Sequence, residues 1–378
     1  MIPDIITPAY VFDIDELILR TRKIKELLGK NVSLCFAIKA NPFLLNAIKD
    51  EIDCFEVCST GEFRICEREC LPLEKIVLSG VYKNKDDIKR IVGICGDRAV
   101  YTIESTSQAE LLDFVAKENG IVLKVLLRLS SGNQFGMDAI NILKIIENRK
   151  NYAFDILGIQ YYSGTQKREN KIVREIEKID DFVQAIENTS FIVSRIEYGP
   201  GLKIGYFQDE QIDEAVELDV LTRSLSVFNG RNITLELGRF LVADCGSYYT
   251  TIVDAKNNEG INYAIVDGGI NHLNYFGQTM AMKIPWYKYS DNNQSEEEEE
   301  EQCTICGSLC TASDVLVRNV PIKPVVGNVI CFDKAGAYSV TESMYLFLSH
   351  DLPRIYFRQN GTLTLVRDFM RTDIINSI

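Results

Sequence analysis

The sequence predicts an α/β protein in which a TIM-like (β/α)8 barrel is followed by a C-terminal antiparallel β domain. Two observations predict this fold class. Between about residues 25 and 245, short β-rich runs alternate with amphipathic helical stretches, and that alternation builds a parallel sheet. After residue 245 the pattern changes to alternating apolar and polar residues with few long helices, which is typical of antiparallel strands.

The chain is long enough for two domains. Its 378 residues exceed the usual size of one domain. Its 46% hydrophobic and 25% charged residues are ordinary for a soluble globular protein. We expect residues 25–245 to form the barrel, and residues 1–24 and 246–378 to form the β domain.

Eight runs are predicted as barrel strands. They are Leu34–Ile38, Phe55–Cys58, Lys75–Ser79, Ala99–Ile103, Leu123–Leu129, Ile156–Tyr162, Arg195–Tyr198 and Ile233–Leu237. The carboxyl ends of the strands form the active face of such a barrel. The polar residues and glycines at these ends are therefore the candidates for a functional site: Lys39, Ser59, Gly80, Glu104, Arg128, Gly164, Gly199 and Glu236.

Helices are predicted between the barrel strands, for example at 86–94, 108–117 and 171–186. Ser107 and Glu110 have the spacing of a capping box, which predicts that they open the second of these helices. In the second domain the predicted strands are Tyr248–Val253, Tyr263–Val266, Val315–Val320 and Val329–Phe332. Residues 354–366 are predicted to form a hairpin, because Asn360-Gly361 favours a type I′ turn.

Charge and hydropathy exclude several partners. The net charge of -13 opposes binding to a phosphate backbone, so no nucleic acid is expected. No apolar run approaches the roughly 18 residues of a membrane span. Residues 1–4 lack the pattern of a secretory signal, so we expect a cytoplasmic protein. The run Glu296–Glu301 is predicted to be a solvated loop, with a tail that docks a partner as the alternative.

The cysteines predict thiols rather than a metal centre. Eleven cysteines are an odd number in a chain with no visible secretory signal, which favours reduced thiols. Structural zinc sites favour two tight Cys-x-x-Cys pairs. The set Cys54, Cys58, Cys66 and Cys70 has wider spacing inside each pair. We therefore expect no metal site.

Three strand ends carry the chemistry. Lys39 directly follows an apolar strand, where desolvation can lower the pKa of an amine toward nucleophilic use, although a surface lysine would look the same. Gly199-Pro200-Gly201 could bring backbone N–H groups to a phosphate, or could simply be a turn. Residues 236–239, Glu-Leu-Gly-Arg, supply an acid, a glycine and a guanidinium within four positions.

Together these segments resemble the fold-type III pyridoxal phosphate (PLP) decarboxylases, the ornithine and diaminopimelate decarboxylase family. This family has the alanine racemase/decarboxylase-like fold. The segments that carry the resemblance run in order along nearly the whole chain. They are Thr7–Val11, Phe36–Pro42, Glu56–Glu62, Arg128 with Phe135-Gly136, Gly164–Gln166, Glu236–Arg239, Asp267–Gly269, Gly307–Asp314 and Gly336–Tyr338.

The resemblance implies a role for each matching residue. Lys39 is the lysine that holds PLP, and Cys310 is the proton donor after CO2 leaves. Contacts to PLP are implied for Lys39, Glu56, Arg128, Tyr162, Thr165, Gly199, Gly201, Glu236, Gly238, Arg239 and Tyr338. Thr311 and Asp314 are implied to contact the substrate. The family also implies a homodimer with shared active sites, in which Cys310 and Asp314 cross from the neighbouring subunit.

Three positions depart from the family pattern. Tyr162 stands where most relatives place a histidine on the face of the cofactor ring, and Gln160 replaces another histidine. Thr311 replaces the acid that relatives use to bind a distal ammonium, which predicts an uncharged distal end in the substrate. The motifs are similar to those of carrier-protein-linked amino acid decarboxylases of antibiotic biosynthesis (butirosin type). This similarity implies a glutamyl-type substrate presented by an acyl carrier protein.

Three alternatives stay open at this stage. The protein could decarboxylate free diaminopimelate or ornithine. It could be a PLP-fold binding protein without activity, although it retains Lys39 and Cys310. It could be a racemase, although racemases are not expected to carry the Gly-Ser-Leu-Cys segment at 307–310.

Overall fold

The structure is a computed structural model that describes residues 5–228, 230–290 and 302–378. The predicted loop at Glu296–Glu301 lies outside the described residues. The chain forms two compact units. The barrel unit comprises the described residues of 20–203 and 213–241, and the sheet unit comprises the described residues of 1–19, 204–212 and 242–378.

Eight parallel strands close into a barrel, as the sequence predicted. Strand β2 pairs with β3 on one side and with β9 on the other, which completes the ring. The strands are β2 (Val32–Ala37), β3 (Cys54–Val57), β4 (Ile76–Leu78), β5 (Val100–Ile103), β6 (Leu123–Arg128), β7 (Phe154–Tyr162), β8 (Arg195–Gly199) and β9 (Asn232–Leu237). They are almost entirely buried, as strands covered on both faces must be.

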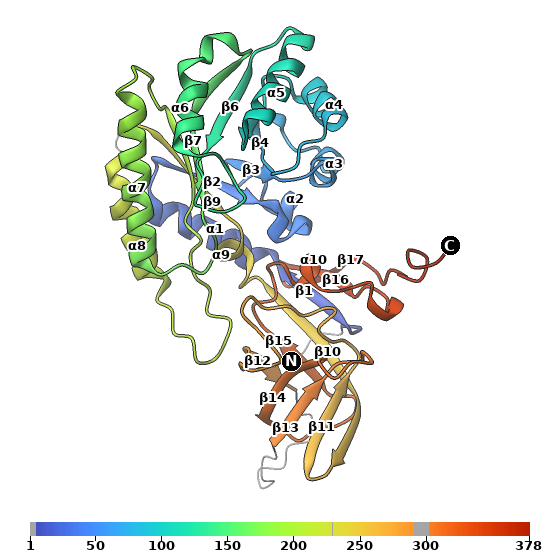
Figure 1. The fold of residues 1–378 in the computed structure, drawn as a ribbon. Coiled ribbons are helices and arrows are strands. Elements are labelled where there is room, and N and C mark those ends of the chain that lie inside the picture. The colour runs from blue at the N-terminus through green and yellow to red at the C-terminus, as the bar shows by residue number, and fades with distance from the viewer. Residues whose placement is uncertain (1–4, 229, 291–301) are drawn as a thin grey trace. The chain divides into compact units, whose positions relative to one another are not determined.

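Helices connect successive strands and lie outside them, except that the first helix precedes β2 and the last follows β9 (Figure 1). They are α1 (Ile14–Leu28), α2 (Leu45–Ile48), α3 (Thr60–Arg68), α4 (Lys85–Cys95), α5 (Thr106–Asn119), α6 (Ala139–Glu147), α7 (Glu169–Glu187), α8 (Glu214–Ser224) and α9 (Arg239–Val242). The predicted capping box of α5 is wrong. Ser105, not Ser107, caps this helix, because the Ser105 hydroxyl accepts the backbone N–H of Gln108 at 3.1 Å.

The described residues of the sheet unit form a nine-stranded sheet. Seven strands follow the path β14-β13-β11-β10-β1-β16-β17, while β15 pairs with β10 and β12 pairs with β15. The strands are β1 (Ala9–Asp13), β10 (Gly246–Asn258), β11 (Ile261–Val266), β12 (Tyr287–Tyr289), β13 (Gln302–Cys306), β14 (Val315–Pro321), β15 (Val329–Phe332), β16 (Arg354–Gln359) and β17 (Thr362–Arg367). One short helix, α10, spans Ser339–Glu342. Most strand pairs are antiparallel, but β1 with β16 and β11 with β13 are parallel.

Two local features of the sheet unit bear on the sequence predictions. Asn360 and Gly361 have φ values of 50° and 74°, so the predicted type I′ turn between β16 and β17 is confirmed. Residues 204–212 fall inside the span expected for the barrel but pack in the sheet unit. There Phe207 bridges Pro285, and Trp286 Nε1 donates to the Gly205 carbonyl at 3.2 Å.

Among the described residues, no helix combines the length and apolar character needed to cross a bilayer.

Candidate active site

Lys39 lies in a single 3-10 turn, Ile38–Ala40, directly after β2. Its Nζ donates to Glu56 and lies 3.3 Å from Glu236 Oε1. Closure of the barrel produces this grouping. In the strand registers, Ala37 lies opposite Glu56 on β3 and Cys35 lies opposite Glu236 on β9. One lysine and two acids from three neighbouring strands therefore meet at the carboxyl end of the barrel.

The two carboxyl groups beside Lys39 have opposite pKa shifts. Burial, followed by the nearby Glu56 carboxylate, raises the pKa of Glu236 well above its usual value. Burial also opposes ionisation of Glu56. The Lys39 ammonium and a hydrogen bond from Glu236 outweigh that cost and lower the pKa of Glu56. Of the pair, Glu236 is therefore the group that more readily holds a proton, and Glu56 is the carboxylate that balances Lys39.

Two glycine turns approach each other closely at the ends of β7 and β8. A Cβ on Gly201, whose φ is +61°, would lie 2.1 Å from the Gly164 carbonyl oxygen. A Cβ on Gly199 would lie 2.6 Å from Tyr162 Cδ2. Neither position has room for a side chain, so only glycine allows the two turns to approach this closely. Loops after the late strands commonly bind phosphate in such barrels.

The other predicted barrel residues lie near this face. Charges on Glu236, Lys39 and Arg239 all act on the Tyr162 phenol, whose pKa is raised mainly by burial. Gly238 and Thr165 lie in the segments that follow β9 and β7. Their predicted contacts to a cofactor remain predictions.

Arg128 has a protein partner of its own. Its Nη1 donates to Glu104 Oε1 at 2.9 Å, and the guanidinium lies 4.9 Å from the centre of the Phe135 ring. Deeper in the barrel, Gln160 Nε2 donates to Glu197 Oε1 at 3.0 Å. Burial raises the pKa of Glu197. The side-chain amide of Gln160 therefore donates a hydrogen bond to a buried carboxyl group.

The remaining predicted site residues belong to the sheet unit. Cys310 is exposed, and the Thr311 hydroxyl lies 2.9 Å from that of Ser313. Asp314 is buried. Its two carboxylate oxygens accept the backbone N–H groups of Ile270 at 2.9 Å and of Leu309 at 2.7 Å. This carboxylate therefore ties the segment that contains Cys310 to the segment after β11.

Tyr338 is the last of the predicted residues. Its backbone has a positive φ of 67° with a ψ of -32°, immediately before α10. Such a conformation is uncommon for a tyrosine and aims its side chain differently from an extended residue. Its predicted contact to a phosphate remains a prediction.

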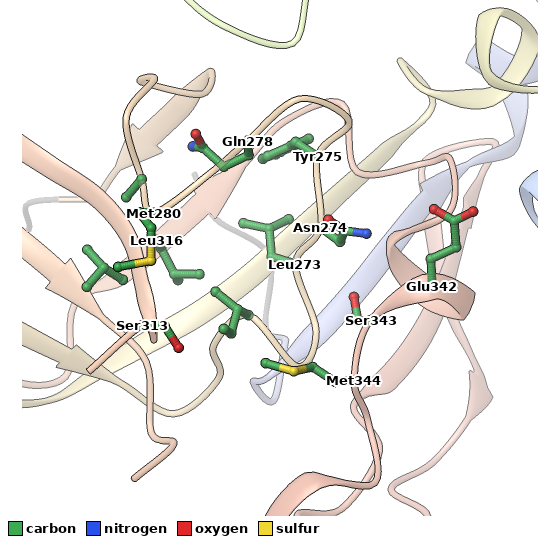
Figure 2. A pocket seen from close by; sticks show the side chains of 13 residues that line it. Leu273, Asn274, Tyr275, Gln278, Met280, Ser313, Leu316, Glu342, Ser343 and Met344 are labelled. Atoms are coloured by element: carbon green, nitrogen blue, oxygen red, sulfur yellow. The ribbon is translucent and has the colours of Figure 1, made fainter. Parts of the chain in front are cut away.

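A pocket of about 300 Å³ lies in the sheet unit next to the Cys310 segment. Ser313 lines it together with Leu316, Met280 and Met344, and Figure 2 shows these side chains around the opening. Asn274 and Gln278 add amide groups, and the one charged lining residue is Glu342 of α10. The pocket thus combines apolar walls with hydrogen-bonding groups.

Several residues near the barrel face were not singled out from the sequence. Lys83 follows β4, and burial lowers its pKa to about 8, opposed by the Glu104 charge. Lys167 and Glu175 form a buried ion pair behind the glycine turns. A signal for that pair was present, because Glu175 interrupts the apolar stripe of the amphipathic helix α7 and a charge there needs a partner.

Among the described residues, the cysteines form no disulfide, and no cluster of possible ligands forms a metal site. All eleven cysteines are free thiols. Within 5–228, 230–290 and 302–378, no group of three or more His, Cys, Asp or Glu side chains could hold a metal ion.

The fold and the site define a barrel enzyme with a lysine at the centre of its active face. The family model described as "Pyridoxal-dependent decarboxylase, C-terminal sheet domain" matches residues 9–336. The chain belongs to this pyridoxal-dependent decarboxylase family, and it is an enzyme of the amino acid decarboxylase class.

Two relatives and one solved structure are similar to this chain over most of its length. The chain is 25% identical to L-glutamyl-[BtrI acyl-carrier protein] decarboxylase of Niallia circulans, over 96% of this chain and 91% of the relative. It is 26% identical to diaminopimelate decarboxylase of Methanocaldococcus jannaschii, over 96% of this chain and 88% of that relative. The crystal structure of diaminopimelate decarboxylase from M. jannaschii superimposes with a TM-score of 0.86 at 23% identity and covers 98% of this chain and 92% of that one. This structural likeness shows the shared fold.

Proposed function

We propose that this protein binds PLP through Lys39 and removes the α-carboxylate of an amino acid whose distal end is tethered, with a glutamyl thioester on an acyl carrier protein as the leading substrate. The placement of the Lys39 amine between Glu56 and Glu236 carries this proposal. The relative from Niallia circulans supports the choice of substrate, as does Thr311 at the position of an expected acid.

The residues present fit the cofactor. Glu236 is a buried carboxyl group with a raised pKa, and a pyridine nitrogen would give it a partner for its proton. The turns at Gly199 and Gly201 leave no room for a Cβ, and Gly238, Arg239, Thr165 and Tyr338 would add contacts to the phosphate. PLP, when bound, supplies the electron sink for loss of CO2.

We propose a homodimer in which Cys310 of the partner subunit donates the proton that replaces CO2. Exposure of the Cys310 thiol is compatible with this role. Mixing inactive Lys39→Ala and Cys310→Ala chains should restore part of the activity, because some heterodimers then hold one intact site. No recovery after confirmed subunit exchange would contradict a shared site.

Borohydride reduction followed by peptide mapping tests the cofactor assignment. We expect the label on Lys39. Lys83 is the rival amine, since it is buried and its pKa is lowered to about 8. A Lys83→Ala variant should keep the label on Lys39, whereas a Lys39→Ala variant should lose it. Label on Lys83, or none, would refute the role of Lys39.

One observation favours a second candidate, a free diamino acid substrate. Glu342 lines the pocket beside Ser313, and its carboxylate could bind a distal ammonium in place of the missing acid at position 311. CO2 release from free and carrier-bound amino acids separates the candidates. A kcat/KM for free diaminopimelate or ornithine of about 10⁴ M⁻¹s⁻¹, the lower end for typical enzymes, would refute the proposal that the substrate is tethered. In that case Glu342→Gln should abolish the preference for diamino acids.

A further inference from the structure

Lys167 is a buried lysine that lies directly behind the two glycine turns. Its side chain is 1% exposed. Nζ donates to Glu175 Oε2 at 2.7 Å and to the Gly199 carbonyl oxygen at 3.1 Å. It also lies 5.5 Å from the centre of the Tyr162 ring. A desolvated ammonium is costly, and burial lowers the pKa of Lys167 despite its partner. Burying this ammonium costs free energy, so stability alone does not explain why Lys167 is held in this position.

Both ends of Lys167 bind the turn between Gly199 and Gly201. The side chain donates to the Gly199 carbonyl, and the backbone N–H donates to the Gly201 carbonyl at 2.9 Å. The side chain also occupies the space beside Gly201, because a Cβ there would lie 3.0 Å from Lys167 Cε. Lys167 follows Gly164 by three positions, so one residue fastens the turn after β7 to the turn after β8.

Glu175, on helix α7, holds Lys167 in this position between the two glycine turns. We call Lys167 and Glu175 together the Lys167 clamp. Besides the Lys167 ammonium, its carboxylate accepts the Ser163 hydroxyl and, at 2.9 Å, the Tyr198 hydroxyl. Ser163 precedes Gly164, and Tyr198 precedes Gly199. The carboxylate thus receives one donor from the segment leading into each glycine turn, and Lys167 crosses between the turns.

We propose that Lys167 is a positioning residue for the phosphate of the cofactor. It fixes the spacing of the two glycine turns and places a positive charge behind them, where a phosphate dianion would bind their backbone N–H groups. The inference rests on the proposed function, because it requires that PLP binds at this face. It assigns to Lys167 and Glu175 a contribution to cofactor affinity that depends on the phosphate group.

The test compares PLP with pyridoxal, which lacks the phosphate. Dissociation constants of both are measured on cofactor-free protein by absorbance of the lysine adduct. Lys167→Met should weaken PLP binding by about tenfold to a hundredfold, the usual cost of losing a residue that orients the groups in direct contact with a ligand, and should leave pyridoxal binding unchanged. Lys144→Met removes an exposed lysine from α6 and should leave the binding of both ligands unchanged.

A second variant guards against misfolding, because Lys167→Met removes the cation that is paired with the buried Glu175 carboxylate. In Lys167→Met/Glu175→Gln the charge is removed, while the carbonyl of the introduced amide can still accept a hydroxyl. This folded double variant should show the same selective loss of PLP. PLP affinity equal to wild type in it, or equal losses of PLP and pyridoxal, would overturn the proposal. Wild-type protein that binds no PLP would overturn the cofactor assignment, and the role of Lys167 with it.

Discussion

Replacing Asp314 by asparagine separates two roles for this side chain. The resemblance implied contact with the substrate, whereas the structure commits both carboxylate oxygens to backbone N–H groups of Ile270 and Leu309. The space around the carboxylate is tight, since a Cβ on Gly307 would lie 2.3 Å from Oδ2. We therefore expect Asp314→Asn to act first on stability and on the order of the segment that holds Cys310.

The expected magnitude follows from the two hydrogen bonds. Asparagine keeps one acceptor and turns an NH2 group toward the other backbone N–H. One hydrogen bond to a charged group is lost, typically about 1.5–3 kcal/mol, and a buried N–H is left unsatisfied at about 1–3 kcal/mol. Burial raises the pKa of Asp314, so removing its charge returns part of this loss. The net cost is about 2–4 kcal/mol, or roughly 5–15 °C in Tm for a unit of this size.

Thermal and urea unfolding measure the cost, with Asp254→Asn as the matched control. Asp254 is an exposed aspartate on β10, in an ion pair with exposed Lys256 at 3.4 Å, and its replacement should change stability by at most about 0.5 kcal/mol. The rate of Cys310 alkylation reports the order of its segment and should rise in Asp314→Asn. A variant that melts with wild type but raises KM would refute this reasoning and restore the substrate contact.

Two further predictions concern stability and the glycine turn. Burial lowers the pKa of His272 to about 3, below its usual value of about 6.5. The unfolded chain therefore binds more protons between these values, and stability is lost as the pH falls from about 6.5 toward about 3. His272→Gln should flatten the pH dependence of the urea midpoint over this range. Gly201→Ala should weaken PLP binding far more than Gly29→Ala, because both glycines have positive φ but only a Cβ on Gly201 meets backbone, the Gly164 oxygen at 2.1 Å. Equal effects of the two alanines on PLP affinity would contradict the close approach of the turns.

The barrel could be predicted from the sequence because its signals are local. Each strand is a short apolar run that ends in a polar residue or glycine, and the barrel order follows the chain order. Once closure is assumed, the meeting of Lys39 with Glu56 and Glu236 follows from strand register. The wrong choice of Ser107 as the cap of α5 was also a local error. Two serines stand two positions apart, and the hydrogen bond to Gln108 selects the first.

Other parts of the site depend on contacts that no local pattern encodes. The bonds of Asp314 join two segments that are 44 positions apart. The Lys167 clamp combines a helix residue with two turns, and neither Lys167 nor Glu175 belongs to a motif that the resemblance rests on. The parallel pairing of β1 with β16 is equally hidden, because nothing in either run specifies its distant partner.

The position of β1 has a consequence for how the chain matures during synthesis. Asp13 of β1 pairs with Arg358 of β16, 345 positions further along. At the usual rate of about 5–20 residues per second, β1 waits roughly 17–70 s on the ribosome before this partner is made. The barrel strands all lie between Val32 and Leu237, so they can assemble during that wait. One edge of β1 can pair with β10 once residues 246–249 are made, but the edge that pairs with β16 remains available to a chaperone, or to another nascent chain, until residues 354–358 are made.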